Sequence, residues 1–251
     1  MGEGPGFEDH FAASAAAYAR ARPRYPEALY VAIDEARTGS ALAWDCASGS
    51  GQAIGPLAAR FAHVVASDAS AAQLTRLVPA ANVSRVLARA ERAPLATASV
   101  DVVTVAQALH WFAGNAFYDE VRRVLRPGGV FAAWTYDRLA VTPAVDGLLD
   151  SFYHDTLRDC WPPERRHVEQ RYAELPWPFT DSTTLTLEMR ARWSCAVLCG
   201  YLASWSAVAV YRRRHHGDPL AALVAPLRAA WGAVSTRWVS WPLTLKLARL
   251  S

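Results

Sequence analysis

A chain of 251 residues with 52% hydrophobic and 20% charged residues is long enough to bury a sizeable core and too apolar to be disordered. Its formal net charge of +3 comes from 26 basic and 23 acidic residues scattered along the chain, which argues against a dedicated binder of nucleic acid. The first residues lack a basic stretch followed by an apolar segment, and four cysteines in a chain of this size do not indicate a disulfide framework. We therefore expect a cytoplasmic protein with no role at a membrane.

The first 136 residues are expected to form helices and buried strands. Residues 7–37 predict two helices separated at residues 22–26, where two prolines forbid a continuous helix. From residue 41 onwards, short apolar runs alternate with segments that have apolar residues at helical spacing, which is typical of a parallel sheet covered on both faces. The expected strands are 42–47, 63–67, 83–87, 100–106 and 130–136, and the expected helices between them are 52–61, 71–78 and 117–125.

The remaining residues differ in texture. Residues 137–182 are rich in aromatic residues and proline and are expected to form a helical cap. Apolar and polar residues alternate strictly at 185–193 and at 243–247, which predicts two strands with one solvent-facing side each. We expect them to extend the sheet at one edge as an antiparallel pair. Between them, the apolar but interrupted stretch 195–211 predicts a buried helix and not a membrane span.

The most informative motif is the segment 44–52, Trp-Asp-Cys-Ala-Ser-Gly-Ser-Gly-Gln, at the end of the first predicted strand. Gly49 and Gly51 allow the backbone to turn sharply and a ligand to lie against it. Asp68 follows the second strand, where a carboxylate can accept hydrogen bonds from both hydroxyls of a ribose. Together, the turn and the acid predict a nucleoside site.

The kind of nucleoside follows from the rest of the motif. A dinucleotide site would show three glycines in the pattern Gly-x-Gly-x-x-Gly, and this chain lacks the third. Asp45 precedes the turn, where its carboxylate would repel a phosphate and attract a cation. A cofactor that carries an ammonium and a sulfonium would suit this site.

At these residues the sequence resembles the class I S-adenosylmethionine-dependent methyltransferases, whose glycine motif is acid-x-Gly-x-Gly-x-Gly. Asp68 matches the ribose-binding acid of that family, residues 90–95 resemble the segment beside the adenine, and residues 99–103 and 123–129 resemble the flanks of the fourth and fifth strands. Residues 18–26, 107–112, 200–206 and 241–243 resemble the type 11, small-molecule branch that is similar to trans-aconitate methyltransferases.

The resemblance implies a fold and a cofactor. The fold is a three-layer, Rossmann-like α/β sandwich with a seven-stranded, mostly parallel sheet, one antiparallel strand and a helical cap. The expected organisation is a single domain over residues 1–251, with an N-terminal cap (1–40), a cofactor-binding core (41–136), a cap insertion (137–182) and a C-terminal part (183–251). The cofactor is S-adenosyl-L-methionine, no metal is expected, and the protein is a monomer or a homodimer.

Ten residues are candidates for contact with this cofactor. Tyr18 and Arg22 are expected near its methionine carboxylate, because a guanidinium makes paired hydrogen bonds with a carboxylate. Ala47 stands where the family usually has its first glycine. At a positive φ this alanine would cost roughly 1 kcal/mol, but we expect a negative φ here because the other two glycines are kept. The full set is Tyr18, Arg22, Asp45, Ala47, Gly49, Gly51, Asp68, Ala90, Glu91 and Gln107.

The acceptor side is less defined. His110, just after the fourth strand, is the best-placed general base, although a plain lining role for His110 and Trp111 is favoured slightly over base catalysis. Trp134, Tyr136 and Tyr201 are further candidates for the acceptor pocket. The expected activity is methylation of a small organic acceptor, on oxygen in preference to nitrogen or carbon. Two alternatives stay open: a relative that binds the cofactor without turnover, suggested by Ala47, and a methyltransferase acting on RNA or protein, against which the weak net charge argues.

Overall fold

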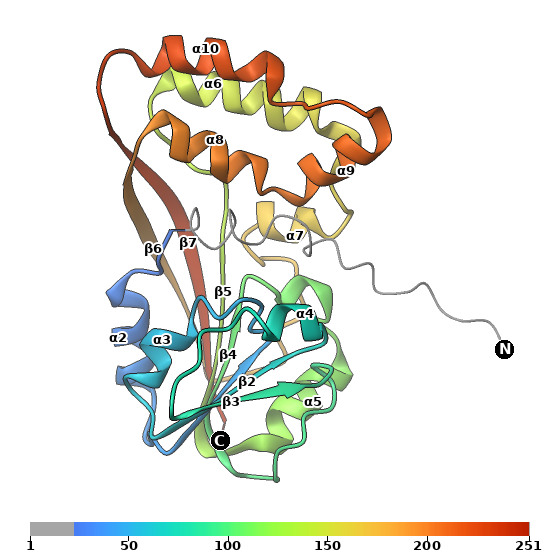
Figure 1. Ribbon diagram of the computed structural model, residues 1–251. Helices are drawn as coiled ribbons and strands as arrows, with labels where there is room; N and C mark the ends of the chain where they lie inside the picture. Colours follow the sequence, from blue (N-terminus) through green and yellow to red (C-terminus); the bar gives the residue numbers. More distant parts are fainter. Residues whose placement is uncertain (1–22, 251) are drawn as a thin grey trace, which may run out of the picture. The chain divides into compact units, whose positions relative to one another are not determined.

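The computed structural model describes residues 23–250, and its contacts divide the chain into two compact units (Figure 1). The sheet unit comprises residues 23–140, 163–191 and 238–250, and the helical unit comprises 141–162 and 192–237. The first of the two predicted N-terminal helices lies outside the described residues, and the second is α2 (Glu27–Ala36). The structure groups residues 163–182, which were expected in the cap, with the sheet. The expected single domain stays a prediction.

The sheet has seven strands in the order β3-β2-β1-β4-β5-β7-β6. Strand β1 pairs in parallel with β2 and β4, β2 with β3, and β4 with β5, whereas β5 and β7 are antiparallel. The predicted mostly parallel sheet is therefore confirmed. The strands are β1 (Leu42–Cys46), β2 (His63–Asp68), β3 (Val83–Leu87), β4 (Val100–Ala106), β5 (Leu125–Tyr136), β6 (Ser182–Trp193) and β7 (Arg237–Arg249). The strand order reverses at β1, and ligands of such sheets bind at the carboxyl ends of the strands at this point.

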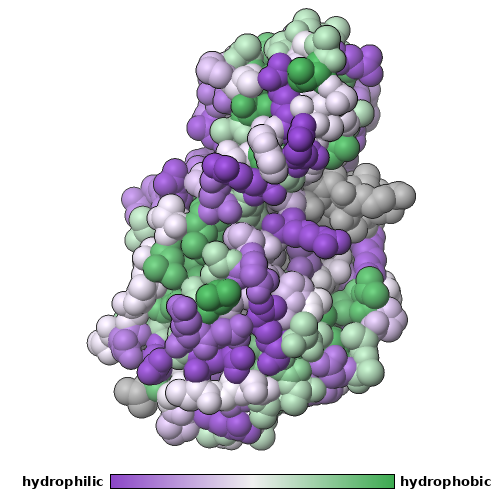
Figure 2. All heavy atoms as spheres, turned by 90° about the vertical axis from the view of Figure 1, so that its left-hand side faces the viewer, coloured by the Kyte–Doolittle hydropathy of each residue, from purple (hydrophilic) through white to green (hydrophobic). Residues whose placement is uncertain are grey.

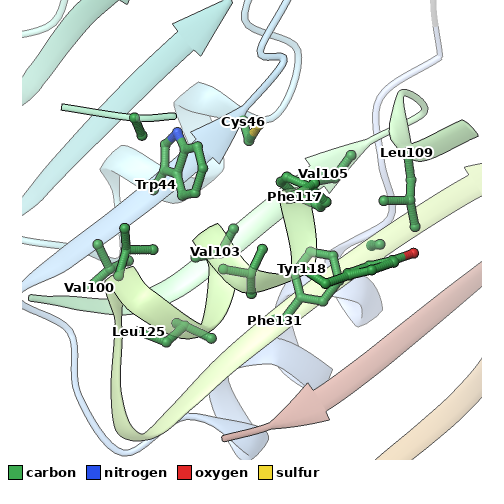
Figure 3. Packing of buried hydrophobic residues seen from close by; sticks show 14 of the residues in the cluster. Trp44, Cys46, Val100, Val103, Val105, Leu109, Phe117, Tyr118, Leu125 and Phe131 are labelled. Carbon is green, nitrogen blue, oxygen red and sulfur yellow. The ribbon is translucent and has the colours of Figure 1, made fainter. Parts of the chain in front are cut away.

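Alternating strand residues bury one face of the sheet against α5 (Asn115–Val124). Trp44 on β1, Val103 on β4 and Phe131 on β5 lie in one apolar cluster with Phe117 and Tyr118 of α5 (Figure 3). Helix α5 ends with Arg122 and Arg123 near its C-terminus, where positive charge favours the helix dipole. Because side chains alternate along a strand, the neighbours of these buried strand residues, such as Asp45 beside Trp44 and Thr104 beside Val103, point to the opposite face of the sheet.

Several element bounds differ from the prediction. Strand β5 begins at Leu125, not at residue 130, because Leu125 pairs with Val100 of β4, and Gly128 and Gly129 exchange backbone hydrogen bonds with Leu250. That partner is far away in sequence, so local patterns give no sign of it. Helices α3 (Ile54–Ala58) and α4 (Ala71–Leu74) are shorter than expected, since each ends in a turn of its own.

The predicted solvent-facing side is present in β6 and absent from β7. In β6, at the edge of the sheet, Leu185, Leu187 and Met189 are at least partly buried, whereas Glu188 and Arg190 are exposed. This confirms the predicted solvent-facing side of β6. On the face of the molecule that Figure 2 shows, hydrophilic and hydrophobic residues are interspersed. The prediction is wrong for β7. That strand lies between β5 and β6, and its Thr244 is buried.

The helical unit contains α6 (Pro143–Ser151), a π-helical turn (Phe152–Thr156), a 3-10 turn (Arg158–Cys160), α8 (Cys195–Ala203), α9 (Ser206–His215) and α10 (Ala221–Trp231). The single helix predicted over 195–211 is wrong: α8 and α9 are bent by 68° at Ser204 and Trp205. The Ser204 hydroxyl donates to the carbonyl of Tyr201 (2.6 Å), and Trp205 takes an extended conformation. Among the described residues no single helix has the length and apolar character to cross a membrane, although α8 and α9 pass that test as a bent pair.

Candidate functional site

The turn after β1 has three residues with positive φ: Ala47 (+54°), Gly49 (+53°) and Gly51 (+86°). The expected negative φ at Ala47 is therefore wrong. A left-handed conformation costs a residue with a Cβ about 1–2 kcal/mol, and the turn keeps it because the following backbone is fixed. The N–H of Ser48 donates to the carbonyl of Ser67 on β2 (2.9 Å), which ties the turn to the neighbouring strand.

The two glycines of the turn have different roles. A Cβ at Gly51 would lie 2.8 Å from Cγ of Leu77, so this position must be glycine for packing as well as for its φ. A Cβ at Gly49 would meet no heavy atom of the described residues within 4 Å. Gly49 therefore presents bare backbone toward open space, where a ligand can approach.

Asp68, at the tip of β2, is in direct contact with this turn. Its Oδ2 accepts a hydrogen bond from the N–H of Gly49 (2.9 Å), and its Oδ1 accepts one from the N–H of Ser70 (2.8 Å). A carboxylate has about four lone-pair directions, so it can accept hydrogen bonds from several donors at once, and a ribose hydroxyl is a donor of this kind. The structure thus brings together the two features that the sequence assigned to one nucleoside site.

Asp45 lies on β1 next to the turn and is 1% exposed. Its Oδ1 accepts a hydrogen bond from the Thr104 hydroxyl (2.6 Å), while its Oδ2 has no partner among residues 23–250. Burial, with the charge of Asp68 adding to it, raises the pKa of Asp45 to about 7, and the bond from Thr104 opposes this rise. The hydroxyl of Tyr30, whose pKa is raised by burial and by the charge of Asp45, is also buried without a partner in the described part of the chain.

These features fit an adenosyl cofactor with an ammonium group. A buried carboxylate oxygen without a donor is costly, and a ligand cation would satisfy it. The glycine turn offers backbone at close range, and Asp68 offers acceptors beside it. The residues present are therefore compatible with S-adenosylmethionine.

The other candidate cofactor residues are placed as follows. Gln107 has a φ of +58° and uses its side-chain amide to bind the backbone of Tyr136, donating to the carbonyl (3.0 Å) and accepting from the N–H (2.8 Å). It thus continues the pairing of β4 with β5. Ala90 and Glu91 lie on the loop between β3 and β4, where Glu91 approaches Arg89 (3.8 Å). Tyr18 and Arg22 lie outside the described residues.

The loop that carries Ala90 and Glu91 is held by a pair of residues that the sequence reading missed. Glu120 of α5, which is buried, accepts a hydrogen bond from the N–H of Ala93 (2.7 Å) and two from Arg123 (2.7 Å each). Arg123 also donates to the carbonyl of Leu95 (2.7 Å). The spacing of the two charges, three residues apart on an amphipathic helix, was the available sign of this clamp.

His110 and Trp111 lie on a 3-10 turn (Leu109–Trp111) just beyond the carboxyl end of β4. His110 Nδ1 is 3.0 Å from the hydroxyl of Tyr172. Burial, followed by the charges of Arg165 and His167, lowers the pKa of His110 to about 3, so this imidazole is neutral at physiological pH. Trp111 is 44% exposed.

The remaining acceptor candidates do not all belong to one place. Trp134 and Tyr136 are buried on β5 and contact the ring of Tyr25, with centroid distances of 5.3 and 6.4 Å. Tyr201 belongs to the helical unit, where its ring contacts those of Trp193 and Trp205. No group of three or more His, Cys, Asp or Glu side chains that could hold a metal ion occurs in the described part of the chain.

The strand order β3-β2-β1-β4-β5-β7-β6, with β7 antiparallel to β5, a glycine turn after β1 and an acid at the tip of β2, is the arrangement expected of a class I S-adenosylmethionine-dependent methyltransferase. Comparison with known proteins gives the family. The model of a methyltransferase domain (type 11) matches residues 44–133. The chain is 33% identical to a provisionally named methyltransferase of Dictyostelium discoideum over 232 residues, 90% of this chain and 87% of that protein.

Two further similarities agree. The solved structure of a provisionally named type II methyltransferase from Anaeromyxobacter dehalogenans is 45% identical, with a TM-score of 0.84, and covers 91% of this chain and 97% of that one. An uncharacterised methyltransferase of Mycobacterium tuberculosis is 40% identical over 120 residues, 47% of this chain and 49% of that protein. The chain belongs to the methyltransferase family, which confirms the resemblance noted in the sequence and S-adenosylmethionine as the methyl donor.

Proposed function

We propose that this enzyme transfers the methyl group of S-adenosylmethionine to an oxygen, carboxylate or hydroxyl, of a small organic acceptor. The choice of an oxygen acceptor is supported by His110, a neutral imidazole at the carboxyl end of β4 whose Nδ1 lies within hydrogen-bond distance of the Tyr172 hydroxyl. A fixed, uncharged histidine suits an oxygen acceptor, which it can orient by one hydrogen bond. The mild net charge of +3 favours a small molecule over RNA as the acceptor.

The donor side is assigned to residues at the carboxyl ends of β1 and β2. Gly49 leaves room for the cofactor against the turn, and Gly51 keeps the turn packed against Leu77. Asp68 accepts from the ribose hydroxyls of the cofactor, and the unpaired oxygen of Asp45 faces its ammonium. Ala90 and Glu91 would border the adenine, on the loop that Glu120 holds. When bound, the cofactor supplies a methyl group on a positively charged sulfur, which an aligned nucleophile displaces.

The protein's own contribution is alignment and exclusion of water. The aromatic residues Trp111, Trp134 and Tyr136 are candidates for enclosing the acceptor beside His110. The four cysteines are free thiols, which is compatible with a reducing compartment, and we place the enzyme in the cytoplasm. It is expected to act as a monomer or a homodimer.

A second candidate function is favoured by one observation, the positive φ of Ala47. Strain of about 1–2 kcal/mol in the turn would suit a relative that holds the cofactor, or its product, without turnover. The two functions differ in one measurable quantity. An enzyme consumes the methyl donor in the presence of its acceptor, and a binding protein does not.

The test is to incubate the purified protein with a small-molecule extract of the source cells and S-adenosylmethionine labelled in its methyl group. Mass spectrometry should find a labelled small molecule that is absent with an Asp68→Ala control. Binding of the cofactor by calorimetry without any labelled product, across extracts and acceptor panels, would favour the second function. Label in RNA or protein fractions alone would refute a small-molecule acceptor.

A further inference from the structure

The two edges of the sheet differ in length. At one edge, β3 (Val83–Leu87) has five residues, and at the other edge β6 (Ser182–Trp193) has twelve. Within residues 23–250 no strand lies beyond β6, which has β7 as its neighbour in the sheet (Figure 1). The outer side of β6 therefore offers a long row of backbone N–H and C=O groups to another strand.

Strand β6 lacks two of the features that prevent an edge strand from pairing. It is long, and its sequence, Ser-Thr-Thr-Leu-Thr-Leu-Glu-Met-Arg-Ala-Arg-Trp, contains no proline. The structure describes all twelve residues of the strand, and none of them has a positive φ. A long and regular edge strand is a template for a further strand. Charged side chains also protect edges, but those of β6 favour one particular partner.

The charged residues of β6 form a pattern that is complementary to itself. Glu188 and Arg190 lie on the solvent-facing side, where they are 45% and 63% exposed, and Arg190 Nε is 2.8 Å from Glu188 Oε2. Two copies of the strand can pair in antiparallel order about a two-fold axis at Met189. In this register Glu188 of each copy lies directly opposite Arg190 of the other copy. Opposed side chains of an antiparallel pair are close together, and opposite charges at such positions are favourable.

Neighbouring registers of the same two strands lack this match. An axis at Glu188 would place two glutamates opposite each other, and an axis at Arg190 would place two arginines opposite each other. Exposed ion pairs add little to affinity, but like charges in direct opposition disfavour a register. The charges of β6 therefore favour the register centred on Met189.

The apolar side of β6 fits the same register. Side chains alternate along a strand, so Leu187, Met189 and Ala191 lie on the face opposite the two charges. Leu187 and Ala191 are partly exposed, and Met189 is buried. In the paired copies Leu187 lies opposite Ala191, and Met189 lies opposite Met189 of the second copy. Pairing would therefore cover apolar surface that a single chain leaves partly exposed.

The geometry points to a homodimer in which the β6 strands of two copies pair in antiparallel order, centred on Met189, and join the two seven-stranded sheets into one. The surface contains none of the candidate cofactor or acceptor residues, so the inference does not depend on the proposed function. One pair of strands buries less surface than a standard protein interface, and we expect dimers to form at roughly micromolar or higher protein concentrations.

Charge reversal tests the register. Glu188→Arg places arginine opposite arginine in the dimer, and Arg190→Glu places glutamate opposite glutamate. Sedimentation equilibrium over a series of protein concentrations gives the Kd of the dimer, which should rise at least about tenfold in each single variant. The double variant with both reversals again opposes unlike charges and should dimerise like the unaltered protein. A one-to-one mixture of the two single variants should form a heterodimer at concentrations where neither variant associates with itself.

A second exposed ion pair supplies matched controls. Arg158 and Asp155 of the helical unit lie 3.5 Å apart and are 71% and 66% exposed. Asp155→Arg and Arg158→Glu should leave the Kd of the dimer unchanged, and circular dichroism checks that every variant is folded. Hydrogen exchange at residues 182–193 should slow as the concentration of the unaltered protein rises, and should not slow in Glu188→Arg.

Two kinds of result would overturn the inference. The first is an unaltered protein that stays monomeric up to roughly millimolar concentrations. The second is a dimer whose Kd is unchanged by the single reversals, or whose affinity the folded double variant fails to restore. Either form of the second result would show that Glu188 and Arg190 do not oppose each other across the interface.

Discussion

Replacing Ala47 by glycine tests the strain in the turn after β1. Glycine takes a φ of +54° freely, so the change removes about 1–2 kcal/mol of strain from the folded state. Glycine also makes the unfolded chain more flexible, which opposes the gain by roughly 0.5–1 kcal/mol. The expected net gain is about 0.5–1 kcal/mol in the free energy of unfolding, or a rise in Tm of roughly 1–4 °C for a protein of this size.

Ala98 offers a matched control. It has a φ of +49°, is exposed, and precedes β4 at the end of that strand remote from the glycine turn. Ala98→Gly should raise the Tm by a similar amount, as followed by thermal unfolding monitored by circular dichroism. Calorimetric titration with S-adenosylhomocysteine should show a changed affinity in Ala47→Gly alone. A lower Tm in Ala47→Gly would refute the strain and show instead that the Ala47 methyl group stabilises the turn.

Three further changes have defined outcomes. Gly51→Ala should lower the free energy of unfolding by roughly 2–3 kcal/mol through backbone strain and overpacking, whereas Gly49→Ala should lower it by roughly 1 kcal/mol. Urea unfolding can compare the two variants, and equal losses would contradict the packing role of Gly51. Burial raises the pKa of Asp45 from 3.8 to about 7. Between these pH values only the folded state binds the proton, so the stability of the protein declines as the pH rises through this window. Asp45→Asn should remove the decline, and a Tm difference between variant and parent that does not grow from pH 5 to pH 8 would disprove this. The pKa of Glu120 is lowered, chiefly by its hydrogen bonds with Arg123. Glu120→Gln should therefore lower the free energy of unfolding by about 1–2 kcal/mol at neutral pH, and this difference should fade as the pH falls through the lowered pKa. An equal difference at acid pH would show that the charge of Glu120 does not stabilise the fold.

The part of the fold that local patterns specify could be predicted. Apolar runs bounded by turn residues predicted the five parallel strands. The central strands of the sheet are buried on both faces and need a continuous apolar sequence, whereas β3 lies at the edge and is only partly buried. The proximity of Asp68 to Gly49 followed from the rule that the carboxyl ends of neighbouring parallel strands meet at one edge. The alternation of apolar and polar residues in β7 predicted a solvent-facing side that the strand does not have. Its position between β5 and β6 follows from the strand order of the sheet, which local sequence patterns do not specify.

Other features depend on contacts that no local pattern reveals. The positive φ of Ala47 is imposed by bonds to β2 and could not be inferred from the two retained glycines. The partnership of His110 with Tyr172 joins residues 62 positions apart across a strained turn. The clamp formed by Glu120 carried a sign in its spacing to Arg123, but its target, the N–H of Ala93, lies on another loop.

A crystal structure with bound S-adenosylhomocysteine is the most direct test of the central claim, that the glycine turn after β1 and the acid at the tip of β2 hold the adenosine. The account predicts electron density with both ribose hydroxyls within hydrogen-bond distance of Asp68 and the amino group beside Oδ2 of Asp45. Density for the nucleoside at any other place on the protein would contradict it.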